Sequence, residues 1–336
     1  MEREPLVDGT SPPQGASPLG RWFLVARRVF SLAVLLALAV VCVHAFRGIS
    51  SVSLHVESGW LVLSWVVAVS SFPLLAVAWA ELLAAYGYRL PVATSVRLWC
   101  LAQASRYLPT GLAAVASRAV LASRHGVPRT LAVLTMAVEG GLLVSWSALG
   151  AGLLLFDHAR LAIGALALAG LFGVVAGPVL LHAASRATRR WVPLKQLQGW
   201  QTRLRERSTP PVLRPLVLAD AIVGVSLVIK TTAFVVFARA LLPVGSSDIA
   251  LLAGAANLAV VAGLVGVTPA GLGVREGVLI ALLGGRFGAG NVTAMALALR
   301  VFDLTVELPW VLGSVIANRR HRATGQPVAA PATVRP

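Results

Sequence analysis

Six uninterrupted apolar runs of roughly membrane-spanning length dominate this sequence of 336 residues. The runs cover about 29–46, 60–85, 131–155, 161–183, 216–241 and 291–317. A helix needs about 20 apolar residues to cross a hydrocarbon core of ~30 Å. Only 12% of the residues are charged, which is about half the share in soluble domains. These features predict an all-α, polytopic membrane protein with about six spanning helices.

Two further apolar segments, 92–123 and 248–286, are interrupted in the middle by a proline–glycine turn. The turns are Pro109-Thr110-Gly111 and Pro269-Ala270-Gly271. The arms beside each turn have about 12–18 residues, so most are too short to cross the membrane as straight helices. We therefore expect two re-entrant helical hairpins, each of which dips into the membrane and returns to the same side.

Positive charge is concentrated on one side of this layout. With the amino terminus inside, the pieces 1–28, 86–129, 185–215 and 317–336 contain 22 of the 29 lysines and arginines. Lysine and arginine are enriched in cytoplasmic loops, so both termini are expected in the cytoplasm. This placement explains the formal net charge of +16 without a nucleic-acid partner.

The same layout divides the chain. Residues 1–28 form a Pro/Gly/Ser-rich leader and 318–336 an Ala/Pro-rich tail, and both are expected to be disordered. A single transmembrane domain covers 29–317. Its basic cytoplasmic loop, 185–215, is predicted to rest as an amphipathic helix on anionic lipid headgroups.

The two turns belong to an internal repeat whose halves cover about 60–155 and 216–317. Leu108–Leu112 matches Thr268–Leu272, and in each half a charged residue follows the proline by about 30 positions. The first hairpin enters from the inside and the second from the outside, so the halves have inverted topology. Inverted repeats whose broken helices meet near the bilayer centre are typical of transporters.

Each turn predicts an anion-binding position within the membrane. The half-helix after it points its amino terminus at the bilayer centre, where free N–H groups and the helix dipole favour a phosphate or carboxylate. Proline needs no N–H partner there, and glycine lets a ligand approach the backbone. The alternative is that the turns are kinks that serve only packing. The residues predicted for these positions are Pro109, Gly111, Pro269, Gly271 and Gly273.

Arginines close to the turns are the expected contacts for the anion. A charge at the bilayer centre costs about 2.5–3.5 kcal/mol on insertion scales, so such residues line cavities or pair with one another. Arg275 follows the second turn and is the residue we expect to touch the ligand. Arg106 and Arg118 are its counterparts in the first hairpin, with snorkelling to the cytoplasmic interface as the alternative.

Four further charged residues complete the predicted site: Glu139, Glu276, Arg300 and Asp303. Arg300 and Asp303 share a helix face at i, i+3, so a purely structural ion pair is the alternative there. The sequence has no metal-ligand spacing, phosphate loop, dinucleotide motif or serine-nucleophile motif, so we expect no cofactor and no enzymatic activity. Glu276 with Asp303 is the one acid–base pair that an intramembrane enzyme could use.

The turn regions resemble a known family. Arg106–Gly111, followed by Arg118 and Glu139, looks like the first half of that family, and Thr268–Gly277 looks like its second-half Pro-Gly-Gly-x-Gly-x-Arg-Glu element. This is the lysylphosphatidylglycerol synthase transmembrane-region family, also called flippase-like, and the resemblance covers about residues 25–318.

The resemblance implies a bacterial or archaeal inner-membrane protein. In fused members this domain moves an aminoacylated phospholipid between leaflets, beside a soluble aminoacyl transferase domain. No such domain is expected here, so lysyl transfer is not predicted. The sequence departs from the family at Thr110 and Ala270, where glycine is usual, and at Gly140, where arginine is common.

These features predict a protein of the bacterial inner membrane that binds and translocates an anionic lipid or a polyprenyl-linked lipid. Its expected partners are membrane lipids, and the sequence assigns no oligomeric state. The alternative is a non-catalytic membrane scaffold or accessory subunit that binds an enzyme of cell-envelope lipid or glycan synthesis.

Overall fold

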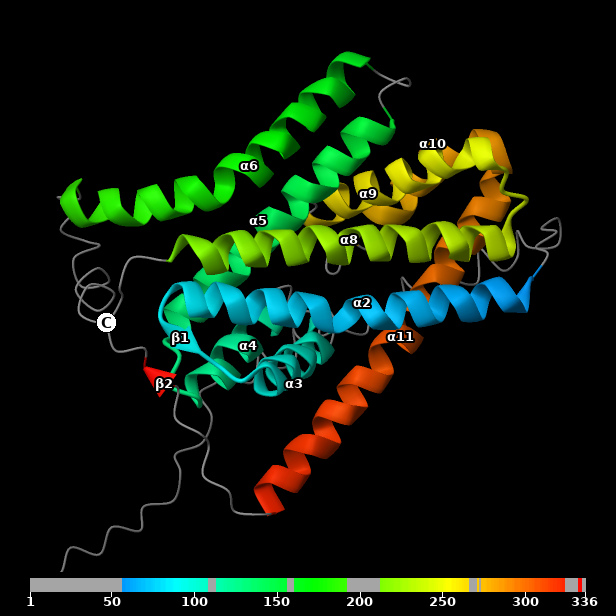
Figure 1. Cartoon of the computed structure of the whole chain (residues 1–336). Coiled ribbons are helices and arrows are strands. Elements are labelled where there is room, and N and C mark those ends of the chain that lie inside the picture. Colours follow the sequence, from blue (N-terminus) through cyan, green and yellow to red (C-terminus); the bar gives the residue numbers. More distant parts are fainter. Residues whose placement is uncertain are drawn as a thin grey trace, which may run out of the picture.

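The computed structural model describes residues 56–107, 113–155, 160–191, 212–265, 271, 273–323 and 332–333. This part of the chain is almost wholly helical (Figure 1), which confirms the all-α prediction. The expected leader 1–28, the expected first span 29–46 and most of the basic loop 185–215 lie outside the described residues.

Most helices begin and end within a few residues of the apolar runs that predict them, although α6 and α11 continue eight and six residues past the ends of their runs. They are α2 (Ser58–Ala85), α3 (Val92–Gln103), α4 (Ala113–Ser123), α5 (Arg129–Leu154), α6 (Arg160–Trp191), α8 (Leu213–Leu241), α9 (Ile249–Val265), α10 (Val274–Phe287) and α11 (Ala289–Ala323). The 3-10 turn η2 (Ala104–Tyr107) follows α3, and η3 (Ser246–Asp248) precedes α9. Two short strands, β1 (Tyr88–Arg89) and β2 (Ala332–Thr333), pair in antiparallel fashion.

Four helical stretches of the described residues are long and apolar enough to cross a membrane, which makes the chain a multi-pass membrane protein by length and composition. They are Ser58–Ala85, Arg129–Leu154, Leu213–Leu241 and Ser246–Val265. The last of these was expected to be one arm of a hairpin, but with η3 it reaches 20 residues. The long helix α11 is not among the four, and its apolar stretch is interrupted by charged residues.

The helices α2 and α8 lie side by side and run in opposite directions (Figure 1). At one end the Glu57 N–H donates to the carbonyl of Ala240 at 3.0 Å. At the other end the Val212 N–H donates to the carbonyl of Ala85 at 2.9 Å. These helices open the two halves of the predicted repeat, so their antiparallel arrangement is the one that inverted halves require.

Each interrupted segment forms two helices that flank its predicted turn, and Pro109-Thr110-Gly111, Pro269 and Ala270 of the turns lie outside the described residues. The helices α3 and α4 pack together, and the hydroxyl of Ser105 in η2 lies 2.6 Å from that of Ser117 in α4. The helices α9 and α10 are antiparallel, and an ion pair between Asp248 and Arg286, 2.8 Å long, closes their open end. At 1.5 Å per residue, α3, α4 and α10 are about 18, 16 and 21 Å long, which is shorter than the hydrocarbon core of ~30 Å.

Each half has its own buried core. The first is built around Trp79 and Trp99, the largest side chains with almost no exposed surface, and it includes the start of α8. The second lies between the later part of α8 and α9, α10 and α11, with Leu283 and Met295 fully buried. The helix α11 continues to Ala323, past the expected end of the membrane domain at 317, so part of the expected disordered tail is helical.

Candidate functional site

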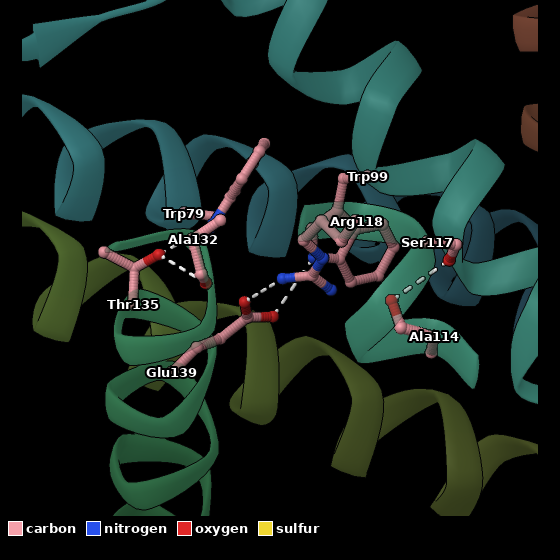
Figure 2. Close-up of polar contacts among 8 residues, drawn as sticks. All are labelled: Trp79, Trp99, Ala114, Ser117, Arg118, Ala132, Thr135 and Glu139. Atoms are coloured by element: carbon pink, nitrogen blue, oxygen red, sulfur yellow. Dashed lines mark hydrogen bonds and ion pairs between the residues drawn. The ribbon is translucent and has the colours of Figure 1, made fainter. Parts of the chain in front are cut away.

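An ion pair between α4 and α5 lies inside the first half (Figure 2). Arg118 Nη1 donates to Glu139 Oε2 at 2.5 Å, and the two side chains are only 4% and 7% exposed. This burial argues against snorkelling for Arg118, because a snorkelling side chain keeps its charged head in water. The guanidinium instead compensates the carboxylate, which would be strongly unfavourable alone in this interior.

Two tryptophans enclose the guanidinium of Arg118. Its central carbon lies 5.3 Å from a ring centre of Trp79 on α2 and 5.3 Å from one of Trp99 on α3. Trp99 Nε1 donates to Glu139 Oε1 at 3.1 Å, so both carboxylate oxygens have a donor. Trp79 Nε1 donates to the hydroxyl of Thr135 on α5 at 3.1 Å. We call these five residues the arginine cage; it joins α2, α3, α4 and α5.

The tryptophans and Thr135 of the arginine cage were not among the predicted site residues. Tryptophan in a membrane protein is most often placed at the water interface, and Trp79 lies near the end of its span, where that rule would put it. Trp79 and Trp99 are 20 positions apart on two different helices, and no local spacing links them to Arg118. Only the packing of the four helices brings these side chains together.

The second half contains a corresponding ion pair with the opposite order of charge. Arg300 Nε of α11 donates to Glu276 Oε1 of α10 at 2.5 Å. In the first half the helix after the break supplies the arginine, whereas here it supplies the glutamate. The ion pair suggested between Arg300 and Asp303 is not formed, and Asp303 makes no salt bridge with a described residue. The side chains of Arg300 and Glu276 are 24% and 18% exposed, so this pair is more open than the first.

The amino end of α10 is occupied by a side chain of the helix itself. Gly273 is the N-cap with φ +82°, and its N–H donates to Glu276 Oε2 at 2.8 Å. Arg300 Nη2 also donates to the carbonyl of Gly271 at 3.4 Å, and the φ angle of Gly271 is +66°. Both glycines therefore adopt backbone conformations that other residues rarely tolerate. An external anion at this helix end would share the site with the Glu276 carboxylate.

The stem of Arg275 lies against two glycines on either side of the break. A Cβ added to Gly271 would fall 3.3 Å from Cδ of Arg275, and one added to Gly263 would collide with its Cγ and Cδ. Gly263 was not predicted, because an isolated glycine in an apolar helix gives no signal of what it faces. The absence of side chains at these two positions leaves room for the arginine beside the break.

The remaining predicted residues are placed as follows. Arg106 lies in η2, where the backbone is described but the side chain is not. Asp303 lies on α11 and is partly exposed. Pro109, Gly111 and Pro269 lie outside the described residues. The structure thus brings the predicted residues together in two groups: Arg118 with Glu139, and Gly271, Gly273, Arg275 and Glu276 with Arg300.

The helix α11 connects these two groups. It carries Arg300 of the second ion pair, and further along it packs against α3 of the first half. There Cys100, the neighbour of Trp99, lies beside Ser314 and the buried Glu307 of α11. A displacement of α11 would therefore act on both halves at once.

A comparison with protein families finds one match that spans most of the chain. Residues 22–313 match a family model described as the lysylphosphatidylglycerol synthase TM region. No curated protein matches the chain in the corresponding search.

Proposed function

Because the chain belongs to the lysylphosphatidylglycerol synthase transmembrane-region family, we propose that it binds an anionic lipid or a polyprenyl-linked lipid and moves it between the leaflets of a bacterial inner membrane. The observation that supports this most strongly is Arg275 at the break between α9 and α10, where two glycines make room for its stem. A cation at a helix break inside the membrane is suited to a phosphate headgroup.

The topology proposed with this function has six spans, two re-entrant hairpins and both termini in the cytoplasm. Three of the four hairpin arms are shorter than the hydrocarbon core, and the ion pair between Asp248 and Arg286 joins the ends of α9 and α10 on one side. The antiparallel α2 and α8 agree with two inverted halves. In this topology α9 enters the membrane and α10 returns to the same side, although α9 together with η3 is long enough to cross the bilayer.

In the proposed mechanism Arg275 contacts the headgroup phosphate, and Arg106 receives it from the other side. Arg118, also expected to bind substrate, is engaged by Glu139 and two tryptophan rings, so it positions α4 and α5 instead. If α9 and α10 move relative to α11, Arg300 on α11 would change its contacts. The movement would be transmitted to the first half through α11. No step requires bond chemistry, so the protein is proposed to act without enzymatic activity.

Reconstitution in vesicles tests this function. Fluorescent phosphatidylglycerol is placed in both leaflets, and a reductant that does not cross the membrane quenches the outer-leaflet probe. We expect the wild type to expose inner-leaflet probe faster than empty vesicles do, and Arg275→Gln to slow it at least tenfold. Arg160→Gln, at the exposed start of α6, is the matched control and should transport normally. Equal rates in empty and protein-containing vesicles would refute translocation.

The closed ion pairs favour a second candidate, a non-catalytic scaffold for an enzyme of envelope synthesis. Arg118, Glu139, Glu276 and Arg300 all have partners within the chain, as expected of residues that only stabilise the fold. Recovery of one envelope glycosyltransferase or acyltransferase at fixed stoichiometry, together with transport rates equal to empty vesicles, would support this alternative.

A further inference from the structure

A cavity of about 330 Å³ is lined by residues from the end of α2, β1 and the start of α8. Figure 1 shows that these three parts of the chain lie close together. The cavity shares no residue with the candidate site. Its volume is at the lower end of the range for small-molecule pockets. The residues that line it are Ala80, Glu81, Ala84, Arg89, Leu90, Val92, Arg214, Pro215 and Leu218.

Three charged side chains line this cavity, one from each of its walls: Glu81 from α2, Arg89 from β1 and Arg214 from the first turn of α8. None of the three forms a hydrogen bond or an ion pair with another described residue. Two guanidiniums and a carboxylate thus face one cavity without neutralising one another. A ligand with a negative and a positive group would compensate them better than an ion of one sign.

The cavity lies at the edge of the apolar part of the protein. Ser58–Ala85 ends there and Leu213–Leu241 begins there, and both are candidate membrane spans. The hydrogen bond from Val212 to Ala85 holds these two ends together. Its rim includes Val92 and Leu218, which are 54% and 45% exposed. Charged walls with an apolar rim at the end of two spans match the level of lipid headgroups, with the acyl chains alongside the helices.

We propose that this cavity binds the headgroup of a phospholipid that carries both a phosphodiester and a primary ammonium group, as phosphatidylethanolamine does. Arg89 and Arg214 hold the phosphodiester, since guanidinium groups match its oxygens in charge and geometry. Glu81 accepts hydrogen bonds from the ammonium group. The acyl chains pass over Leu218 and Val92. A lipid with only a phosphodiester, such as phosphatidylglycerol, would leave the Glu81 carboxylate without a cation.

Native mass spectrometry of the full chain, extracted gently and offered equal amounts of phosphatidylethanolamine and phosphatidylglycerol, tests this site. Because the proposed transport site would also bind phosphatidylglycerol through Arg275, every protein in this test carries Arg275→Gln, and we expect this background to retain phosphatidylethanolamine preferentially. Glu81→Gln should lower the ratio of retained phosphatidylethanolamine to phosphatidylglycerol about tenfold, the change expected for one charge-assisted hydrogen bond. Adding Arg89→Gln and Arg214→Gln to this background should abolish retention of both lipids, whereas adding Arg160→Gln should leave the retention unchanged.

Three results would overturn the proposal. The first is retention of phosphatidylglycerol as well as phosphatidylethanolamine by the Arg275→Gln background, and the second is an unchanged ratio when Glu81→Gln is added to it. The third is displacement of the lipid by equimolar soluble phosphoethanolamine, which would show a site for the free headgroup rather than for a membrane lipid. Thermal unfolding confirms that each variant is folded. Because Arg275→Gln removes the proposed transport contact from every sample, failure here and failure of translocation are distinguishable.

Discussion

Arg118 of α4 and Glu139 of α5 are joined by a hydrogen bond of 2.5 Å in the interior of the protein, with tryptophan rings 5.3 Å from the guanidinium carbon. Removing one partner of such a pair leaves an uncompensated buried charge, which costs about 3–5 kcal/mol. We therefore expect Glu139→Gln to lower the free energy of unfolding by about that amount, measured by denaturant titration in detergent micelles. Glu57→Gln, at an exposed glutamate before α2, is the control. Equal stability of the two variants would contradict a structural role for the pair.

The two tryptophans of the arginine cage should contribute unequally. Trp99 donates to the Glu139 carboxylate, whereas Trp79 donates to the neutral hydroxyl of Thr135. A hydrogen bond to a charged group is worth about 1.5–3 kcal/mol and one between neutral groups about 0.5–1.5 kcal/mol. Trp99→Phe should therefore destabilise the protein more than Trp79→Phe in the same unfolding measurement. The reverse order would mean that the packing lost when indole is replaced by phenyl, rather than the lost hydrogen bond, dominates the destabilisation.

Alanine at the glycines beside Arg275 should impair the second break. Gly271 has φ +66°, where an alanine costs about 1–2 kcal/mol, and a Cβ there would lie 2.9 Å from Cα of Gly263. We expect Gly271→Ala and Gly263→Ala to slow translocation as strongly as Arg275→Gln does. Gly277→Ala adds a methyl group with no atom within 4 Å, on an exposed part of α10, and should transport normally. Normal transport by Gly271→Ala and Gly263→Ala would show that transport does not depend on the backbone conformation at this break.

The ion pair between Asp248 and Arg286 should contribute little through Arg286 and more through Asp248. The Arg286 side chain is 57% exposed, and exposed pairs are worth about 0–1 kcal/mol. Asp248 Oδ2 also accepts a hydrogen bond from the Gly245 N–H at 2.9 Å at the start of η3. Asp248→Asn should therefore lower the unfolding midpoint more than Arg286→Gln. The effect of Arg286→Gln should also shrink at high salt, because salt screens exposed charges.

Cysteine labelling from one side of the membrane tests whether the helix pairs are re-entrant. In a protein whose Cys42 and Cys100 are replaced by alanine, single cysteines are placed at exposed ends of the pairs. Cysteines at Val92 and Arg124, at the two ends of the α3–α4 pair, should label from the same side. Cysteines at Ser247, within η3, and at Ala289, the first residue of α11, should both label from the opposite side. Labelling of Val92 and Arg124 from opposite sides would mean that this segment crosses the membrane.

Much of the helical layout was predictable from the sequence because it depends on local properties. The apolar run 216–241 appears as α8, Leu213–Leu241, and 60–85 appears as α2, Ser58–Ala85. The helices α3 and α4, and likewise α9 and α10, lie on either side of a proline–glycine turn in the sequence, and these residues disfavour a continuous helix wherever they occur. The length of α9 with η3 was underestimated, because Ser246–Asp248 adds a turn that apolar composition does not reveal.

The sequence alone therefore determined the membrane class and most of the helices, and it identified the charged residues within the apolar segments. The tertiary structure decided which of those charges meet. Arg300 lies three positions from Asp303 on the same helix, yet it pairs with Glu276, which is 24 positions away on α10. Arg118 is likewise held by Glu139 and by tryptophans of two other helices. Helical periodicity fixes only which residues share a face, whereas the choice of partner depends on how the helices pack against one another.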